Sequence, residues 1–335
     1  MIKAYAAMAP GARFEAFEYD PGPLAKNDVE LDVESCGICH SDLSMLDNDW
    51  GFTRYPFVAG HEVVGTVSAV GDNVSNVKVG QRVGLGWQSA YCNSCHTCRS
   101  GDHNLCASVE LTIAGRHGGF ADKVRAQADA VVPLPEGINP DSAGPLFCGG
   151  ITVFNPMVQF DLKPTAKVAV IGIGGLGHIA LQFLHAWGCE VTAFTSSESK
   201  KAEALSLGAH TTLNSASAEE LTAAAGKFDL IISTVNVKLD WNAYINTLAP
   251  KGRLHFVGAT LAPLNIGVFP LIMGQRCVSG SPVGSPATIK TMLDFAALHK
   301  IEPVTETFRF DQVNEAMDKL RQGKAHYRIV LKRDS

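Results

Sequence analysis

The stretch AKVAVIGIGGLGHIALQFLHAWGCEVTAFTS, Ala166–Ser196, decides the fold of the second half of the chain. It begins with an apolar run typical of a buried strand, passes through a glycine-rich turn, continues with apolar residues at helical spacing and ends in a second apolar run. Strands that alternate with helices in this way build a parallel sheet whose faces are covered by the helices. The sequence therefore predicts an α/β domain around this stretch.

The turn contains the pattern G-x-G-x-x-G, formed by Gly172, Gly174 and Gly177. Between a strand and a helix this pattern is typical of dinucleotide binding: the first glycine permits the tight turn, the second lets the backbone approach a pyrophosphate, and the third lets the helix pack close to the sheet. The N–H groups at the start of the helix then face the anion. We expect these three residues, with Gly175 and Leu176, to bind the cofactor; the alternative is a glycine-rich turn without a ligand.

The end of the next strand indicates which dinucleotide binds. An NAD site normally carries Asp or Glu there, for the ribose 2′-hydroxyl. Here the strand ends in Thr195, Ser196 and Ser197, and Lys200 and Lys201 follow. Hydroxyl donors and an ammonium group would stabilise a 2′-phosphate, which a carboxylate would repel, so we expect NADP(H), bound by Thr195, Ser196, Ser197 and Lys200. Alternatively, or in addition, the two serines cap the following helix.

Length and composition limit the class of protein. A chain of 335 residues exceeds the usual size of one hydrophobic core, so we expect two domains. The net charge of −5 gives no basic surface for nucleic acid or an anionic membrane. No apolar run approaches the ~18 residues of a membrane span, and the N-terminal residues do not resemble a secretion signal. We therefore expect a cytoplasmic protein whose nine cysteines are reduced thiols or metal ligands.

The residues outside the α/β stretch have a different pattern of apolar and turn-forming residues. Up to about residue 150, short β-branched runs are broken by Gly, Asp and Asn, which is typical of a β domain of Greek-key or barrel-like form. After Ser285 the pattern predicts a helix over 286–300, a strand in PVTETFRF, a helix near 311–322 and a strand in AHYRIVLK.

Four cysteines lie close together in YCNSCHTCRSGDHNLC: Cys92, Cys95, Cys98 and Cys106. Four thiolates complete the tetrahedral coordination of Zn²⁺ and leave no position for a substrate. The spacing therefore predicts a structural zinc, which holds a lobe at about residues 91–107; the alternative is four free thiols. Two histidines within the lobe are not needed as ligands.

A second metal site would have to be assembled from distant segments. Its candidates are in CGICHSD (Cys36–Asp42), GHE (Gly60–Glu62) and LFCGG (Leu146–Gly150). Each is ambiguous by itself, because a lone Cys is more often a small buried hydrophobe, and Cys36 with Cys39 could also form a redox pair.

The chain resembles the zinc-dependent medium-chain alcohol dehydrogenases. The motifs GICHSDL, AGHEVVGTV, the four-cysteine lobe, GPLFCGGITVF and VIGIGGLGH occur in the order found in that family, over nearly the whole chain. HSDLSMLDNDWG and CGGITVF are most similar to the cinnamyl-alcohol-dehydrogenase branch and its bacterial NADPH-dependent aldehyde reductases. The resemblance implies a GroES-like β domain over 1–151 and 286–335 and a Rossmann domain with a doubly wound parallel sheet over 152–285.

The resemblance also implies roles for individual residues. It makes Cys39, His61 and Cys148 the ligands of a catalytic zinc, with Glu62 beside the histidine ligand. The other implied roles are a proton-relay hydroxyl (Ser41), a carboxylate that orients the histidine ligand (Asp42), contacts with the cofactor pyrophosphate (His40, Arg328) and packing near the nicotinamide (Thr152). Many relatives carry a histidine three residues after the relay hydroxyl, where this chain has Ser44.

The implied activity is NADP(H)-linked interconversion of alcohols and aldehydes, mainly aldehyde reduction, with two Zn²⁺ per chain. Trp50 and Trp87 are candidate walls of a pocket for aromatic or medium-chain aliphatic aldehydes, and ordinary packing is the alternative for both. An apolar segment, Phe269–Gly284, could form the edge of a homodimer. The competing hypotheses are a zinc-independent quinone or enone reductase of the same fold and a non-enzymatic zinc-binding regulatory protein.

Overall fold

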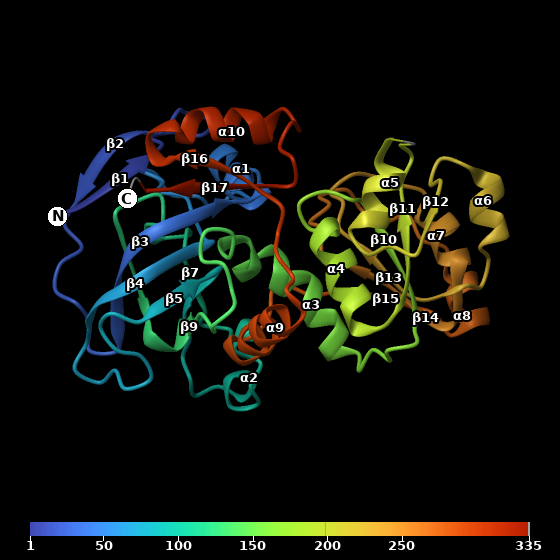
Figure 1. Ribbon diagram of the computed structural model, residues 1–335, viewed down its shortest axis with the longest axis horizontal. Coiled ribbons are helices and arrows are strands. Elements are labelled where there is room, and N and C mark those ends of the chain that lie inside the picture. The colour runs from blue at the N-terminus through green and yellow to red at the C-terminus, as the bar shows by residue number, and fades with distance from the viewer. Residues whose placement is uncertain (198, 334–335) are drawn as a thin grey trace. The chain divides into compact units, whose positions relative to one another are not determined.

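The computed structural model describes residues 1–197 and 199–333 and divides the chain into two compact units (Figure 1). The first unit comprises Met1–Ile151 and Val283–Ser335, whose last two residues lie outside the described part, and the second comprises Thr152–Pro282. The boundary before the C-terminal segment thus lies at Val283, three residues before the position expected from the sequence. No helix among the described residues is both long and apolar enough to cross a membrane.

The first unit is built on a seven-stranded sheet in the order β16-β17-β3-β4-β5-β9, with β8 paired to β3. Its strands are β3 (Asp28–Ile38), β4 (Val63–Val70), β5 (Arg82–Leu85), β8 (Lys123–Gln127), β9 (Val131–Pro133), β16 (Thr305–Arg309) and β17 (Arg328–Lys332). The β17 strand runs antiparallel beside β3, so the end of the chain returns to the domain where it began. Two further pairs are β1 (Ile2–Ala6) with β2 (Glu15–Tyr19) and β6 (Gln88–Ala90) with β7 (Glu110–Leu111).

The helices of this unit are short and lie around the sheet (Figure 1). They are α1 (His40–Asp47), α2 (His96–Arg99), α9 (Pro286–His299) and α10 (Val313–Arg321), with 3₁₀ turns η1 (His103–Leu105), η2 (Ala128–Ala130), η3 (Gly144–Phe147) and η4 (Phe310–Gln312). The single helix expected near 311–322 is thus a 3₁₀ turn followed by α10. The buried apolar side chains form one core that includes Val29, Leu31 and Val33 of β3.

The second unit contains a six-stranded parallel sheet in the order β12-β11-β10-β13-β14-β15. Its strands are β10 (Lys167–Ile171), β11 (Glu190–Phe194), β12 (Thr211–Leu213), β13 (Phe228–Ser233), β14 (Leu248–Phe256) and β15 (Cys277–Gly280). The order reverses between β10 and β13, which is the doubly wound arrangement of dinucleotide-binding domains. The predicted parallel α/β fold is therefore confirmed.

Helices connect these strands in the way that the sequence predicts. They are α3 (Gly149–Gln159), in which the unit begins, α4 (Gly177–Trp187), α5 (Ser199–Ser206), α6 (Ala218–Ala223), α7 (Trp241–Thr247) and α8 (Val268–Gly274). The α4 helix packs on β10 and β11, whereas α7 and α8 pack on β14. Gly188, at φ 100°, ends α4 in the left-handed conformation that glycine adopts without steric cost.

Candidate active site and zinc clusters

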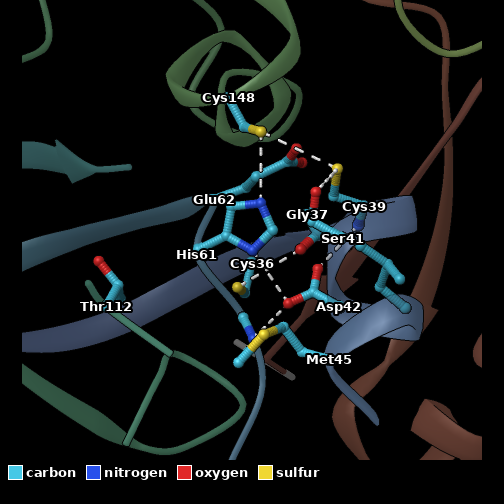
Figure 2. A network of polar contacts seen from close by, with 12 residues as sticks. Cys36, Gly37, Cys39, Ser41, Asp42, Met45, His61, Glu62, Thr112 and Cys148 are labelled. Atoms are coloured by element: carbon cyan, nitrogen blue, oxygen red, sulfur yellow. Dashed lines mark hydrogen bonds and ion pairs between the residues drawn. The ribbon is translucent and has the colours of Figure 1, made fainter. Parts of the chain in front are cut away.

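Four side chains from three separate segments of the first unit meet in its interior (Figure 2). Cys39 lies at the N-cap of α1, His61 and Glu62 immediately precede β4, and Cys148 directly follows η3. One ligand atom from each of these four residues lies within 4.8 Å of the others, and all four residues are buried. The Sγ atoms of Cys39 and Cys148 are 3.9 Å apart, and Nε2 of His61 is 3.3 Å from the second of these. The fold thus brings together the three residues expected to be ligands.

Asp42 fixes the geometry of this cluster through hydrogen bonds. Its Oδ1 atom lies 3.0 Å from Nδ1 of His61 and accepts a hydrogen bond from the Gly60 N–H at 2.9 Å. Its Oδ2 atom accepts from the Cys39 N–H at 2.9 Å. One fully buried carboxylate therefore holds both the Cys39 backbone and the His61 imidazole, and it leaves Nε2 of the imidazole directed at Cys148.

Glu62 and Arg328 form a buried ion pair beside the cluster. The Arg328 guanidinium also donates a hydrogen bond to the Ile38 carbonyl, and the residue is only 3% exposed. The pairing arises because β17 lies next to β3, which ends at the cluster. Within its own unit Arg328 pairs with the Glu62 carboxylate, because a guanidinium at this depth needs a counter-charge. Its expected contact with the cofactor pyrophosphate stays a prediction.

The cluster residues fit a zinc ion. Two thiols and one imidazole form the donor set of a catalytic zinc, in which a fourth position stays open. The hydrogen bond from Cys148 holds the pKa of the Cys39 thiol well below its usual value. Burial raises the pKa of Glu62 to about 7 against the opposing effect of Arg328. The second oxygen of Glu62, Oε2, is buried without a hydrogen-bond partner, as expected of a group beside a cation.

The lobe cysteines form a second group of potential ligands. Their sulfurs also lie within 4.8 Å of one another, with 3.5 Å between Cys92 and Cys106 and 3.9 Å between Cys95 and Cys106. The Cys95 N–H donates a hydrogen bond to the Cys92 sulfur at 3.3 Å. Hydrogen bonds from Ser94 and Cys95 lower the pKa of Cys92 to about 5. These four sulfurs supply a complete tetrahedral donor set and so fit a closed zinc site.

The predicted relay and cofactor residues of α1 lie at its first turn. The Ser41 hydroxyl oxygen is 3.7 Å from the Cys39 sulfur, so it reaches the buried cluster from a half-buried position. His40 is exposed, and Ser44 is buried one turn further on.

Aromatic rings continue from the cluster toward the surface. Trp87 meets His61 edge-on at 4.9 Å between ring centroids, and Trp50 meets Trp87 edge-on at 5.9 Å. Phe52 stacks on Trp50 at 6.0 Å and is 47% exposed. Trp50 and Trp87 also pack against the core, whereas their role as walls of a substrate pocket stays a prediction. Phe52 was not among the pocket residues predicted from the sequence, although its position two residues after Trp50 could have indicated it.

The glycine turn of the second unit has the form that its motif predicts. Gly172 has φ +88°, and a Cβ on it would lie 2.4 Å from Val235, while a Cβ on Gly177 would lie 1.9 Å from the Gly172 carbonyl oxygen. Both glycines are thus required by the protein itself. A Cβ on Gly174 would meet nothing within 4 Å, and its backbone is not left-handed, so the fold gives no reason for glycine there. A ligand that approaches the backbone closely does, and the turn therefore fits a pyrophosphate.

The remaining predicted cofactor residues lie after the carboxyl end of β11, at the start of α5, in the glycine turn and in α3. The Thr195 hydroxyl accepts a hydrogen bond from the Ser197 N–H at 3.2 Å, and the Ser197 hydroxyl lies 2.8 Å from that of Ser199. Ser196 and Lys200 are exposed, which leaves their polar groups accessible to a phosphate. Gly175 and Leu176 lie in the glycine turn itself, and Thr152 is buried in α3.

Two family models match the chain. One is the alcohol dehydrogenase GroES-like domain, over residues 25–136, and the other is the zinc-binding dehydrogenase domain, over residues 175–297. An aldehyde reductase of the cyanobacterium Synechocystis, AdhA, is 65% identical over 99% of this chain and 98% of that protein.

Solved structures of similar proteins share the fold of this chain. A cinnamyl alcohol dehydrogenase from Sorghum bicolor superposes with a TM-score of 0.94 at 37% identity, covering 99% of this chain and 97% of that one. A cinnamyl alcohol dehydrogenase from Helicobacter pylori, solved in complex with NADP(H), gives a TM-score of 0.90 at 29% identity, with the same coverage. The chain thus belongs to the cinnamyl-alcohol-dehydrogenase branch of the zinc-containing medium-chain alcohol dehydrogenases, oxidoreductases that interconvert alcohols and aldehydes.

Proposed function

We propose that the chain is a zinc-dependent, NADP(H)-linked alcohol dehydrogenase that acts mainly as an aldehyde reductase. The observation that carries this proposal is the buried cluster of Cys39, His61 and Cys148, which has the donor set of a catalytic zinc and a carboxylate that orients the imidazole. The 65% identity with an aldehyde reductase supports the direction of the reaction.

The chain's own residues would bind the metal, orient its histidine ligand and transfer a proton. When bound, zinc polarises a carbonyl oxygen and the reduced nicotinamide supplies a hydride. Cys39, His61 and Cys148 hold the metal, and Asp42 keeps the proton of the imidazole on Nδ1. Ser41, half-buried beside the Cys39 sulfur, would relay a proton: in reduction its hydroxyl gives a proton to the substrate oxygen and takes one up from solvent, and in oxidation the proton passes the opposite way.

The preference for NADP(H) rests on the end of β11. The residues there offer hydroxyls and an exposed ammonium, and no carboxylate stands at Thr195, Ser196 or Ser197. The relative from Helicobacter pylori was solved with NADP(H). The double variant Ser197→Asp with Lys200→Ala should erode the ratio of kcat/KM for NADPH over NADH, and an unchanged ratio would refute these contacts. Single replacement of Lys251, which is exposed in β14, is the control.

The substrate class follows from the aromatic rings that border the cluster. Trp87, Trp50 and Phe52 form a continuous apolar path from His61 outward, which favours aromatic or medium-chain aliphatic aldehydes over small polar ones. A panel of aldehydes and alcohols, run with both cofactors, tests this. Equal kcat/KM for acetaldehyde and benzaldehyde would contradict it. Reduction of aldehydes with NADPH corresponds to the activity class EC 1.1.1.2.

The second unit offers a surface for a homodimer. Among the described strands, β15 has a neighbour only on its β14 side, so its other edge is free for pairing. The adjacent segment exposes apolar side chains, each at least 65% accessible: Leu261, Val268, Phe269, Ile272 and Met273. A second copy, related by a two-fold axis, would cover both features. Phe269→Asp should convert a dimer into a monomer in light scattering, and an unchanged mass would refute this surface. The cytoplasmic location stays a prediction from the sequence.

One experiment separates the proposal from its closest competitor. A zinc-independent reductase of the same fold would keep its activity after chelation, whereas the proposed enzyme loses it and regains it when Zn²⁺ is added back. The zinc content should be two per chain before chelation.

A further inference from the structure

The carbonyl of Gly172 lies in a crowded position at the start of the dinucleotide-binding turn. Its oxygen would be 1.9 Å from a Cβ on Gly177, so this carbonyl points into the contact between the turn and α4. On its other side lies Thr234, whose hydroxyl is 2.8 Å from the same oxygen. The oxygen is therefore enclosed by a glycine on one side and a hydroxyl donor on the other.

Thr234 reaches this position because of the sheet register. It follows the last residue of β13, and Ser233 of that strand is paired with Ile171, the last residue of β10. The Thr234 N–H extends the ladder by donating to the Ile171 carbonyl at 3.0 Å. Its hydroxyl lies 3.0 Å from that carbonyl oxygen as well and 2.8 Å from the next one, of Gly172. A single residue thus ties together the two peptide units at which β10 becomes the turn.

The orientation of the Gly172 carbonyl decides where the next N–H points. In a planar trans peptide the C=O and the following N–H point in opposite directions. Because the carbonyl of Gly172 is held against Thr234 and α4, the N–H of Ile173 is directed away from both. Within residues 1–197 and 199–333, the backbone N–H groups of Ile173, Gly174, Gly175 and Leu176 donate to no protein acceptor. They form a run of free donors suited to an anion.

We propose that Thr234 is a positioning residue for the cofactor: its hydroxyl locks the Gly172 carbonyl and so aims the free N–H groups of the turn at the pyrophosphate. The proposal rests on the dinucleotide-binding function proposed above. Thr234 itself does not touch the pyrophosphate. It acts through the peptide between Gly172 and Ile173, which would otherwise be free to rotate at a glycine.

The test is a binding titration on the zinc-loaded, full-length protein. Thr234→Val keeps the shape of the side chain and removes its hydroxyl, and Thr234→Ser keeps the hydroxyl. Because one neutral hydrogen bond is lost, NADPH should bind to Thr234→Val roughly 3- to 10-fold more weakly, as measured by nucleotide fluorescence. Thr234→Ser should bind NADPH like the wild type. The competitor 2′-AMP, which has no pyrophosphate, should bind all three proteins equally.

A matched variant separates positioning from general loss of stability. Thr247, in α7 of the same unit, is fully buried and donates its hydroxyl to the Tyr244 carbonyl at 2.7 Å. Thr247→Val should lower the melting temperature without changing the Kd of NADPH. Wild-type affinity for NADPH in Thr234→Val would overturn the proposal, and so would equal losses of NADPH and 2′-AMP affinity, which indicate a general disturbance.

The wild-type protein distinguishes this proposal from the one on which it rests. If the wild type binds NADH better than NADPH, the proposed cofactor preference fails before any variant is made. Thr234 is then tested in the same way with NADH and adenosine, since both dinucleotides carry the pyrophosphate. Equal NADH affinity in the wild type and Thr234→Val would refute the role of Thr234 independently.

Discussion

The two cysteine clusters of the first unit are built in opposite ways. The lobe takes all four sulfurs from one segment, Cys92–Cys106, and two of its cysteines are only half-buried. The other cluster takes Cys39, His61 and Cys148 from three distant segments, and each is at most 8% exposed. Around it lie two carboxylates, Asp42 and Glu62, one of which keeps a buried oxygen without a partner.

This difference indicates that the metal of the lobe stabilises the fold, whereas the metal of the other, dispersed cluster binds at a site that the fold assembles. The lobe closes its own coordination with four sulfurs, so it needs only a short loop and offers no position to a substrate. The dispersed cluster exists only after β3, β4 and η3 have packed, and its ligands are oriented by groups outside the coordination shell. We therefore expect ligand replacement to abolish chemistry at the dispersed cluster and to lower stability at the lobe.

The largest effect is expected from Cys148→Ala. The variant should lose turnover by more than about a thousand-fold, since Lewis-acid stabilisation of the reacting oxygen contributes on the order of several kcal/mol. Its zinc content, measured by mass spectrometry of the metal, should fall from two per chain to one. The melting temperature should change far less than the activity, because the lobe keeps its own metal.

Cys36 supplies the control for this experiment. It is another fully buried cysteine near the cluster, but its sulfur contacts the Gly37 carbonyl, at 3.6 Å, rather than the ligands. Cys36→Ala should keep two zinc ions and most of the turnover. Retention of both metals in Cys148→Ala, or loss of one in Cys36→Ala, would break the ligand assignment.

The next effect in size is the loss of the lobe metal in Cys98→Ser. Its stability cost should be about 3 kcal/mol, by analogy with a crosslink that closes a loop of this length. For a unit of roughly 200 residues that corresponds to a fall of about 6–12 °C in melting temperature, measured by calorimetry. The kcat per remaining zinc should stay close to the wild-type value below the transition. A collapse of kcat with an unchanged melting temperature would reverse the roles of the two clusters.

How far the sequence predicts each cluster depends on how local the cluster is. The lobe is predictable from spacing alone, since Cys92, Cys95, Cys98 and Cys106 cannot avoid meeting in so short a segment. Cys39, His61 and Cys148 are individually ambiguous, and only the resemblance to a family identified them as a set. The glycine turn lies between these two cases. Its motif predicts the strand, the turn and the helix, because all three come from one continuous segment.

What the sequence could not supply are partners set by strand register. The antiparallel pairing of β17 with β3 gives Arg328 a partner, Glu62, that no motif indicated, while its contact with a pyrophosphate stays a prediction. Thr234 has no motif of its own and becomes important only because β13 lies beside β10. The stacking of Phe52 on Trp50 likewise depends on how the loop after α1 closes.

A smaller effect is expected from Asp42→Asn, which leaves all the ligands in place. The amide offers one acceptor oxygen where the carboxylate accepts from Gly60 and Cys39 and binds Nδ1 of His61. The affinity of the dispersed cluster for zinc should fall by about 10- to 100-fold, the usual effect of removing such a partner. Release of zinc to a chelator, followed by a coloured indicator, should speed up for one metal per chain while the lobe metal is unaffected. Equal release of both metals would mean that Asp42 serves the whole unit rather than one cluster.

Two buried histidines extend the comparison to a site without thiols. Both ring nitrogens of His61 are engaged in the dispersed cluster, by Asp42 and Cys148. His255, on β14 of the second unit, lies 2.9 Å from each of two serine hydroxyls, those of Ser279 and Ser281. Burial favours the neutral ring at both sites. At His61 the Asp42 carboxylate outweighs it and raises the pKa, whereas at His255 burial and the nearby Arg253 lower the pKa to about 4.

The smallest expected effect is therefore a pH dependence that His255 confers on the second unit. Its pKa is lower in the folded chain than in the unfolded chain, so its contribution to stability is complete above the ordinary histidine pKa of about 6.5 and is lost as the pH falls toward 4. Between pH 7 and pH 5 this should cost on the order of 1 kcal/mol, or about 2–4 °C in melting temperature. His255→Asn should be less stable than the wild type at pH 7, because it loses hydrogen bonds, but its melting temperature should fall less between the two pH values. Comparing the two proteins with zinc in excess cancels metal release, which is common to both. A parallel fall in both proteins would show that His255 is not held neutral by its surroundings, and the contrast with His61 would then rest on hydrogen-bond geometry alone.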